Sequence, residues 1–215
     1  MDVFSDRRQA GRALAAALMP LKDEHPVVLA LPRGGVPVAF EVAQALAAPL
    51  DVVLVRKIGA PGHPELGLGA IVEGAEPQVV LNEDIVAILA PDRSYIEAEK
   101  LRQLEEIERR KLLYRGGRPA LSVEGRVAIV VDDGIATGGT VKAVLRALAG
   151  GRPARRVLAV PVAPQETIDA LRPDADEIVC LATPEPFFAV GSHYRDFRQT
   201  SDAEVVELLR RAAGG

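Results

Sequence analysis

The sequence has little of several residue types on which particular classes of protein depend. Its 215 residues include one cysteine, Cys180, no tryptophan, and only 4% aromatic residues. One cysteine cannot form an internal disulfide, and it also excludes a metal cluster built from cysteines. No apolar run approaches the ~20 residues that cross a bilayer, so no membrane partner is expected. With aromatic rings this scarce, the core is expected to consist of aliphatic side chains.

The chain also lacks an excess of positive charge. It has 26 Lys and Arg against 30 Asp and Glu, a net charge of −4 at pH 7. A global positive field of the kind that holds a nucleic-acid backbone is therefore excluded, and no nucleic-acid partner is expected. Residues 1–18 carry an early acid and three arginines in an amphipathic rhythm, unlike a secretory signal. We expect a cytoplasmic protein.

Five short apolar runs are rich in β-branched residues and continuous rather than alternating, which is typical of strands covered on both faces. They are Val27–Leu31, Asp51–Arg56, Arg126–Val131, Arg156–Val162 and Glu177–Ala182. Helix-like stretches lie between several of them, at Val36–Ala47, Gly139–Ala149 and Ala163–Arg172. This alternation predicts an α/β fold with an open, mainly parallel β-sheet and helices on both faces.

A single domain over residues 1–215 is expected, with two segments that interrupt the alternation. Residues 58–69 contain four glycines and two prolines, which predicts a flexible loop. Residues 70–115 are predicted to form an insertion, with a hairpin over 70–81 followed by a helix over Asp92–Arg115. The helix is predicted to be a solvated one that covers one side of the domain, and a partner-binding arm is the alternative.

Charge spacing supports two of the predicted helices. Within Asp92–Arg115, the pairs Glu105–Arg109 and Glu106–Arg110 have the i,i+4 order that stabilises an exposed helix. The C-terminal segment 183–215 ends in a stretch that begins at Ser201 with a helix-capping pattern.

The segment VVDDGIATGGT, Val130–Thr140, follows the third apolar run and leads into a predicted helix. In an open parallel sheet, ligands bind beyond the carboxyl ends of the strands. Small residues there let backbone N–H groups converge on a phosphate, and the hydroxyls of Thr137 and Thr140 can join them. Asp132 and Asp133 can accept hydrogen bonds from vicinal hydroxyls, and their oxygens suit Mg²⁺. The segment therefore predicts a site for a phosphorylated ribose.

An apolar strand followed by two acids and ATGGT resembles the phosphoribosyl-diphosphate (PRPP) signature of the type I phosphoribosyltransferases. The resemblance implies that the two acids hold the ribose hydroxyls and that the following loop holds the 5′-phosphate. In this sequence the hydroxyl and metal role falls to Asp132 and Asp133, and the phosphate role to Ala136, Thr137, Gly138, Gly139 and Thr140.

Two further segments place basic residues where strands are predicted to end. Arg33, Gly34 and Gly35 follow the first apolar run, and an arginine beside glycines at a helix start suits a diphosphate. Arg56 and Lys57 end the second run. The resemblance implies that all five bind the pyrophosphate of PRPP and that a non-proline cis peptide lies near Arg33–Gly34.

The resemblance extends to two segments around the reacting groups. It implies that the loop 58–69 closes over the site, with His63 and Glu65 as candidates for contacts made on closure. Thr183–Phe197 resembles the base-binding segment of purine enzymes in the family. We expect Phe188 to stack on a base and the backbone of Val190 to hydrogen-bond its edge, and the alternative is that Phe187 and Phe188 belong to the core.

The expected activity is Mg²⁺-assisted transfer of the 5-phosphoribosyl group of PRPP to a nitrogenous base with release of pyrophosphate, a step of nucleotide metabolism. Its catalytic residues would be Arg33, Lys57, Asp132 and Asp133. Ala136 stands where 6-oxopurine enzymes of the family carry an Asp, so purine and pyrimidine acceptors both remain open. The partners are small molecules, and the family allows a homodimer. The alternative is a non-catalytic regulator of the same fold that senses PRPP or a nucleotide.

Overall fold

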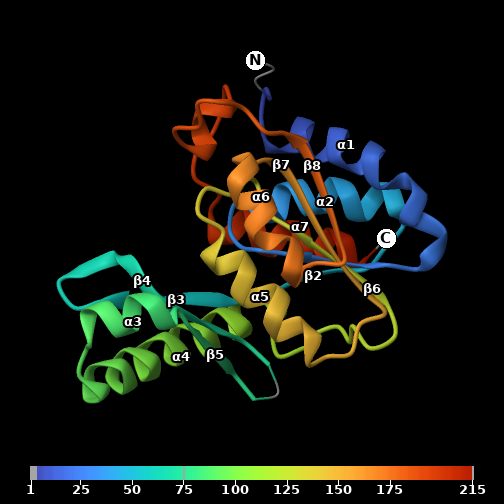
Figure 1. Ribbon diagram of the computed structural model, residues 1–215. Coiled ribbons are helices and arrows are strands. Elements are labelled where there is room, and N and C mark those ends of the chain that lie inside the picture. The colour runs from blue at the N-terminus through green and yellow to red at the C-terminus, as the bar shows by residue number, and fades with distance from the viewer. Residues whose placement is uncertain (1–3, 75, 215) are drawn as a thin grey trace.

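The computed structural model describes residues 4–74 and 76–214, with the exception of the side chains of Pro64 and Glu65. The chain forms a core around a parallel sheet, with a smaller lobe beside it (Figure 1). Within the described residues, no helix is both long enough and apolar enough to cross a lipid bilayer.

Five parallel strands form the core sheet in the order β2-β1-β6-β7-β8. They are β1 (Val27–Ala30), β2 (Leu50–Val52), β6 (Val127–Val131), β7 (Arg155–Val162) and β8 (Glu177–Ala182). Every residue of β1 and β6 is buried. The α/β fold with a parallel sheet, which the continuous apolar runs predict, is confirmed.

Helices cover both faces of this sheet. One face packs against α1 (Arg7–Leu18), α2 (Gly35–Leu46) and α7 (Asp202–Ala213), and the other against α5 (Gly139–Ala149) and α6 (Gln165–Leu171). Because successive strand residues point to opposite faces, Val28 and Ala30 of β1 join the first cluster while Val27 and Leu29 join the second. Short 3-10 helices lie at Met19–Glu24, Arg172–Asp174 and Val190–His193.

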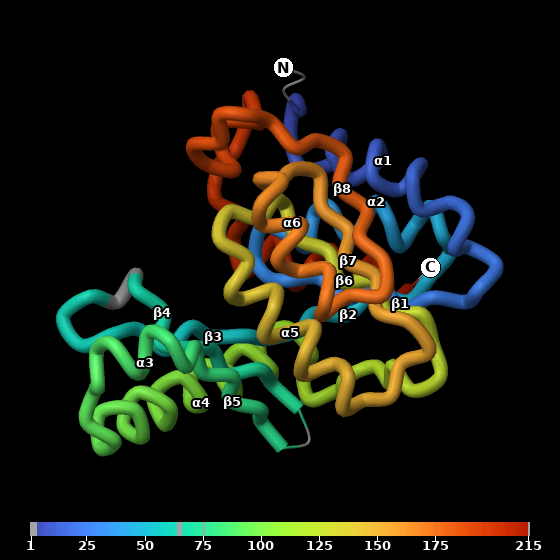
Figure 2. Tube along the Cα trace, in the orientation of Figure 1, coloured from blue at the N-terminus to red at the C-terminus, as the bar shows by residue number. Residues whose placement is uncertain are grey.

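The lobe is an antiparallel sheet in the order β3-β4-β5 with two helices packed on it (Figure 2). Its elements are β3 (Val55–Ala60), β4 (His63–Val72), β5 (Gln78–Leu81), α3 (Glu83–Leu89) and α4 (Arg93–Arg115). The hairpin expected within 70–81 is confirmed as the pairing of β4 with β5. On α4, Arg110 pairs with Glu106 at 2.7 Å as the spacing predicts, whereas Arg109 pairs with Glu106 rather than Glu105.

The prediction of one strand over Asp51–Arg56 is wrong. The apolar run divides between β2 of the core and β3 of the lobe, with Val53 and Leu54 between them. At the break, the N–H of Leu54 donates to the Glu73 carboxylate at 2.6 Å. A side chain from the end of β4 thus takes over a hydrogen bond that a continuing sheet would make, and the apolar pattern carries no sign of it.

The prediction of a loop over residues 58–69 is also wrong, because these residues form the end of β3 and the first part of β4. Ile58 pairs with Gly69, and Gly59 pairs with Gly67 across an irregular hairpin. A β-carbon on Gly69 would crowd the backbone of Leu81 in β5, so this glycine permits close strand approach rather than a flexible loop. His63 is exposed at the start of β4, and the side chain of Glu65 lies outside the described residues.

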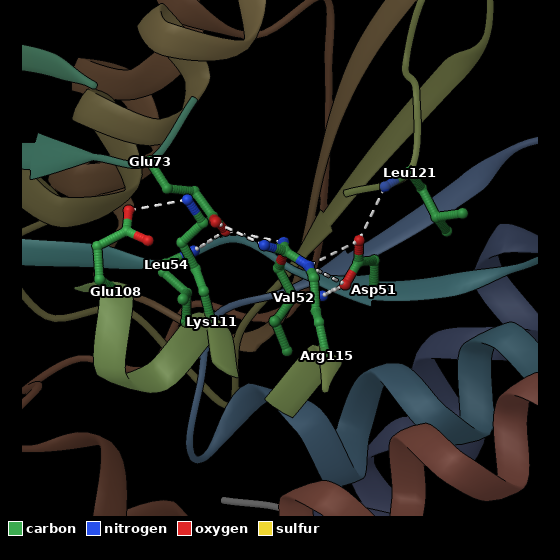
Figure 3. Close-up of polar contacts among 8 residues, drawn as sticks. All are labelled: Asp51, Val52, Leu54, Glu73, Glu108, Lys111, Arg115 and Leu121. Atoms are coloured by element: carbon green, nitrogen blue, oxygen red, sulfur yellow. Dashed lines mark hydrogen bonds and ion pairs between the residues drawn. The ribbon is translucent and has the colours of Figure 1, made fainter. Parts of the chain in front are cut away.

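Arg115, the last residue of α4, joins the lobe to the core (Figure 3). Its guanidinium donates from Nε to Asp51 at 2.9 Å, and from Nη1 and Nη2 to Glu73 at 2.6 and 2.9 Å. Nη2 also donates to the carbonyl of Val52 at 2.6 Å. The Arg115 side chain is 5% exposed, so these charges are paired away from water. Burial alone would lower the pKa of Arg115, but the two carboxylates outweigh it and raise that pKa.

We predict that Arg115→Met lowers the free energy of unfolding by about 3–5 kcal/mol, because two buried carboxylates lose their shared cation. Arg102→Met is the matched control on the same helix, since Arg102 is 65% exposed and its partner Glu99 keeps a hydrogen bond from Gln103. Its effect should stay below about 0.5 kcal/mol. Urea unfolding of both variants measures the difference, and equal midpoints would contradict the role given to Arg115.

Candidate functional site

Two loops meet at the carboxyl ends of the neighbouring parallel strands β1 and β6. The loop after β1 contains Gly34 and Gly35, and β6 continues into Asp132 and Asp133. A β-carbon on Gly34 would overlap the Asp133 carboxylate, and one on Gly35 would lie 2.7 Å from the carbonyl oxygen of Val131. The contact between the two loops therefore requires glycine at both positions.

Arg33 lies in the same loop, directly after a cis peptide bond. The bond joins Pro32 to Arg33, next to the position where a non-proline cis peptide was expected. Arg33 Nη1 lies 3.7 Å from the carboxylate of Asp202 at the start of α7. That carboxylate also accepts a hydrogen bond from the hydroxyl of Tyr114 at 2.5 Å. Burial, together with the bond to Asp202, raises the pKa of Tyr114 to about 12.

Residues 136–140, which we call the donor cup, carry a run of backbone N–H groups at the start of α5. Within the described chain, the N–H groups of these residues have no intramolecular acceptor. Gly138 has φ +75°, a left-handed conformation that turns the chain into the helix. The Thr167 hydroxyl of α6 donates to the carbonyl of Ala136 at 2.6 Å and holds the loop from behind. Exposed N–H groups at a helix N-terminus suit an anion.

Asp132 and Asp133 lie beside this cup in a setting that disfavours two negative charges. Burial, followed by the charge of Asp133, raises the pKa of Asp132 well above its ordinary value. Burial also raises the pKa of Asp133, against the lowering effect of Arg7. Arg7 of α1 donates from Nε to Asp133 Oδ2 at 2.7 Å. The two side chains thus supply acceptor oxygens in the same loop as the N–H donors of residues 136–140.

The C-terminal segment lies against the same loop. A β-carbon on Gly134 would lie 2.5 Å from the Val190 side chain, and the Tyr194 hydroxyl donates to the carbonyl of Asp133 at 2.5 Å. Phe187 packs on His193 with ring centroids 5.2 Å apart. Phe188 is 82% exposed, so the alternative that it belongs to the core is wrong, whereas Phe187 is half-buried and packs against a small buried cluster that includes Tyr194.

The sequence led us to expect Arg56 and Lys57 at the end of a core strand, and this prediction is wrong. Both belong to β3 in the lobe, because the chain leaves the core sheet after β2. Arg56 donates from Nε to Gln103 of α4 at 2.8 Å, and its burial lowers the pKa of its guanidinium. Lys57 lies alongside Gly67 on the neighbouring strand β4.

The described residues contain no group of three or more His, Cys, Asp or Glu side chains that could hold a metal ion. Asp132 and Asp133 nevertheless provide adjacent carboxylates, the donors that Mg²⁺ prefers. A Mg²⁺ ion at this position would complete its coordination with water and with the oxygens of a bound phosphate compound, which is common for this ion. The donor set fits a metal that arrives with its substrate.

Sequence patterns did not identify Arg7, Tyr114, Tyr194 or Asp202 as parts of the site. Arg7 is separated from Asp133 by 126 residues, and the Tyr114–Asp202 bond spans 88. An arginine on an amphipathic helix and a first-turn aspartate have ordinary surface roles, so nothing local marks them. For Tyr194 the only signal was its place in Thr183–Phe197, the segment that resembles a base-binding segment.

We predict that Gly138→Ala lowers the free energy of unfolding by about 1–2 kcal/mol, because a left-handed residue with a β-carbon is strained. The new β-carbon would also lie 2.9 Å from the Thr167 side chain. Gly139→Ala is the matched control, since no atom lies within 4 Å of its β-carbon position. In chemical unfolding, this control should have the same free energy of unfolding as the wild type. A similar loss of stability in both variants would contradict the role given to the left-handed conformation of Gly138.

A family model described as the phosphoribosyl transferase domain matches residues 6–196. Two proteins of Mycobacterium tuberculosis, from strains CDC 1551 and H37Rv, are each 50% identical to this chain over 212 residues. Both are named as provisional phosphoribosyl transferases. The match covers 99% of this chain but 47% of theirs, so the chain spans about half the length of these curated relatives.

Among solved structures, TT1426 from Thermus thermophilus is 48% identical with a TM-score of 0.84, over 99% of this chain and 100% of that one. The AQ2163 protein from Aquifex aeolicus is 14% identical with a TM-score of 0.52, over 86% of this chain and 78% of that one. This second likeness shows the fold alone. With the family match over residues 6–196, these relatives establish that the chain belongs to the phosphoribosyl transferase domain family.

Proposed function

We propose that the chain binds PRPP with Mg²⁺ and transfers its 5-phosphoribosyl group to a nitrogenous base, with release of pyrophosphate. The observation that carries the proposal is the joint placement of Asp132, Asp133 and the donor cup at residues 136–140. The two carboxylates directly follow β6, and a few residues further along the same loop the N–H groups of 136–140 have no acceptor among the described residues. Adjacent acceptors and donors match the vicinal hydroxyls and the 5′-phosphate of one ribose phosphate.

The 5′-phosphate is assigned to the backbone of residues 136–140, with the hydroxyls of Thr137 and Thr140. This cup contains no lysine, so the N–H groups and the N-terminus of α5 supply the attraction for the phosphate. Asp132 and Asp133 would accept hydrogen bonds from the ribose hydroxyls and lie near the positive charge that develops on the ribose at the transition state.

The pyrophosphate is assigned to the loop of Arg33, Gly34 and Gly35, whose end is also the start of α2. The contact of Gly34 with Asp133 brings this loop beside the ribose carboxylates. Arg56 and Lys57 would approach the pyrophosphate from the lobe, and Arg33 and Lys57 would oppose the charge that builds on the leaving group. Mg²⁺ on Asp132 and Asp133 would supply further neutralisation of that charge.

The acceptor base is assigned to the C-terminal segment. Phe188 exposes most of its ring, which makes a face available for stacking on a planar base. The Val190 side chain lies against Gly134 in the loop proposed to hold the ribose, which brings the C-terminal segment next to that loop. Neither residue selects a purine over a pyrimidine, and the proposal covers both.

We predict that the wild-type protein binds Mg²⁺-PRPP in calorimetry and that Asp133→Asn weakens this binding about tenfold or more. The loss follows from replacing a charged acceptor of the ribose hydroxyls by a neutral amide. Asp169→Asn is the matched control, because this aspartate is exposed and pairs with Gln165 of its own helix and with Arg172 in the turn that follows it. It should bind like the wild type.

A screen of nucleobases for pyrophosphate release then separates an enzyme from a sensor. Release with at least one base, lost in Asp133→Asn, is the expected result. Binding of PRPP without turnover on any base would favour the non-catalytic sensor. Absence of PRPP binding, or binding unchanged in Asp133→Asn, would refute the proposal itself.

A further inference from the structure

Arg7 of the N-terminal helix α1 lies in the candidate site, although no local pattern in the sequence marks it. Its guanidinium makes three contacts with two distant segments. Nε donates to Asp133 Oδ2 at 2.7 Å, Nη1 donates to the carbonyl of Arg198 at 2.8 Å, and the guanidinium carbon lies 3.9 Å from the centroid of the Phe197 ring. The Arg7 and Asp133 side chains are 11% and 13% exposed, so the ion pair is largely shielded from water.

Asp133 is held from more than one side. Its carboxylate lies between the Arg7 guanidinium and the backbone of Gly34, where even a β-carbon would not fit. Its backbone carbonyl accepts the hydroxyl of Tyr194, which is itself 6% exposed. The carboxylate therefore has little freedom to rotate. Arg7 donates to Oδ2, and the neighbouring carboxyl group of Asp132 also interacts with the Asp133 carboxylate.

The same arginine fixes the acceptor side of the site. Phe197 packs against Tyr194 with ring centroids 5.1 Å apart, and Arg7 covers the Phe197 ring. Through Phe197 and the carbonyl of Arg198, Arg7 joins the segment that carries Phe188 and Val190 to the ribose loop. A planar guanidinium is suited to this combination, since it can stack on a ring and donate in two directions at once.

We propose that Arg7 is a positioning residue for phosphoribosyl binding. It holds the Asp133 carboxylate in a fixed orientation for the ribose, and it ties the acceptor segment to that carboxylate. This inference rests on the proposed function for its ligand, while the link between the two segments exists without ligand. Arg7 would act through Asp133, so its role is distinct from that of the residues assigned to PRPP.

Three roles are compatible with the contacts of Arg7, and each predicts a different result when Arg7 is replaced. If Arg7 positions Asp133, its removal frees the carboxylate to turn away, and PRPP binding weakens. If Arg7 instead blocks the ribose site, its removal opens the site and binding strengthens. If the contact matters only for the fold, stability falls and the affinity of the folded protein for PRPP stays constant.

The experiment measures calorimetric affinity for Mg²⁺-PRPP in the wild type, Arg7→Met, Arg7→Lys and Arg12→Met. Arg12 lies on the same helix, is 59% exposed and pairs with Glu41, which makes it a matched control outside the site. We expect Arg7→Met to weaken binding about tenfold, Arg7→Lys to recover part of the loss because it keeps the charge, and Arg12→Met to match the wild type.

Hydrogen–deuterium exchange of the same proteins without ligand tests the link between the segments. Arg7→Met should raise exchange in both 133–140 and 194–200, with no change in Arg12→Met. Unchanged or tighter PRPP binding in Arg7→Met, or exchange raised throughout the molecule, would overturn the inference while leaving PRPP binding by the wild type intact. A wild type that does not bind PRPP would overturn the proposed function as well, even if the exchange result followed expectation.

Discussion

The buried ion pairs of Arg115 determine where the lobe lies relative to the core sheet. The chain leaves the core after β2 and returns to it after α4. Residues at both connections contact the Arg115 guanidinium. Asp51 belongs to the core and Glu73 to the lobe, so neither carboxylate can move without losing its shared cation. Burial makes such a cluster costly to break, because each unpaired charge would remain away from water.

The helix α4 also contacts the candidate site, through Tyr114, the residue before Arg115. Tyr114 donates to Asp202, and Asp202 in turn lies next to Arg33 in the loop proposed to bind pyrophosphate. Asp133, on the other side of that loop, is approached by α1 and by the C-terminal segment. Groups from both ends of the chain and from the lobe therefore meet around two loops. Their contacts position the loop that resembles the PRPP signature at the end of a sheet of aliphatic residues.

The sequence predicted those features that depend on local pattern. The half-buried edge strand β8 was recovered with its observed bounds from a continuous apolar run, and the helix α5 from the helix-like stretch between two such runs. The break between β2 and β3 at Leu54 was not predicted, because the Glu73 carboxylate that accepts the Leu54 N–H leaves no mark in the apolar pattern of the strand. Glycines at 58–69 suggested a loop, whereas at Gly69 the missing side chain lets strands approach. Contacts such as Arg7 with Asp133 arise from the packing of distant segments, which no local pattern encodes.

If Asp132, Asp133 and residues 136–140 form one ribose-phosphate site, a crystal structure of the protein with Mg²⁺-PRPP will show it. We expect the 5′-phosphate within hydrogen-bonding distance of the N–H groups of residues 136–140, with the ribose hydroxyls on the carboxylates and the Arg7–Asp133 contact retained. PRPP bound elsewhere on the protein, or bound with its phosphate outside this cup, would contradict it.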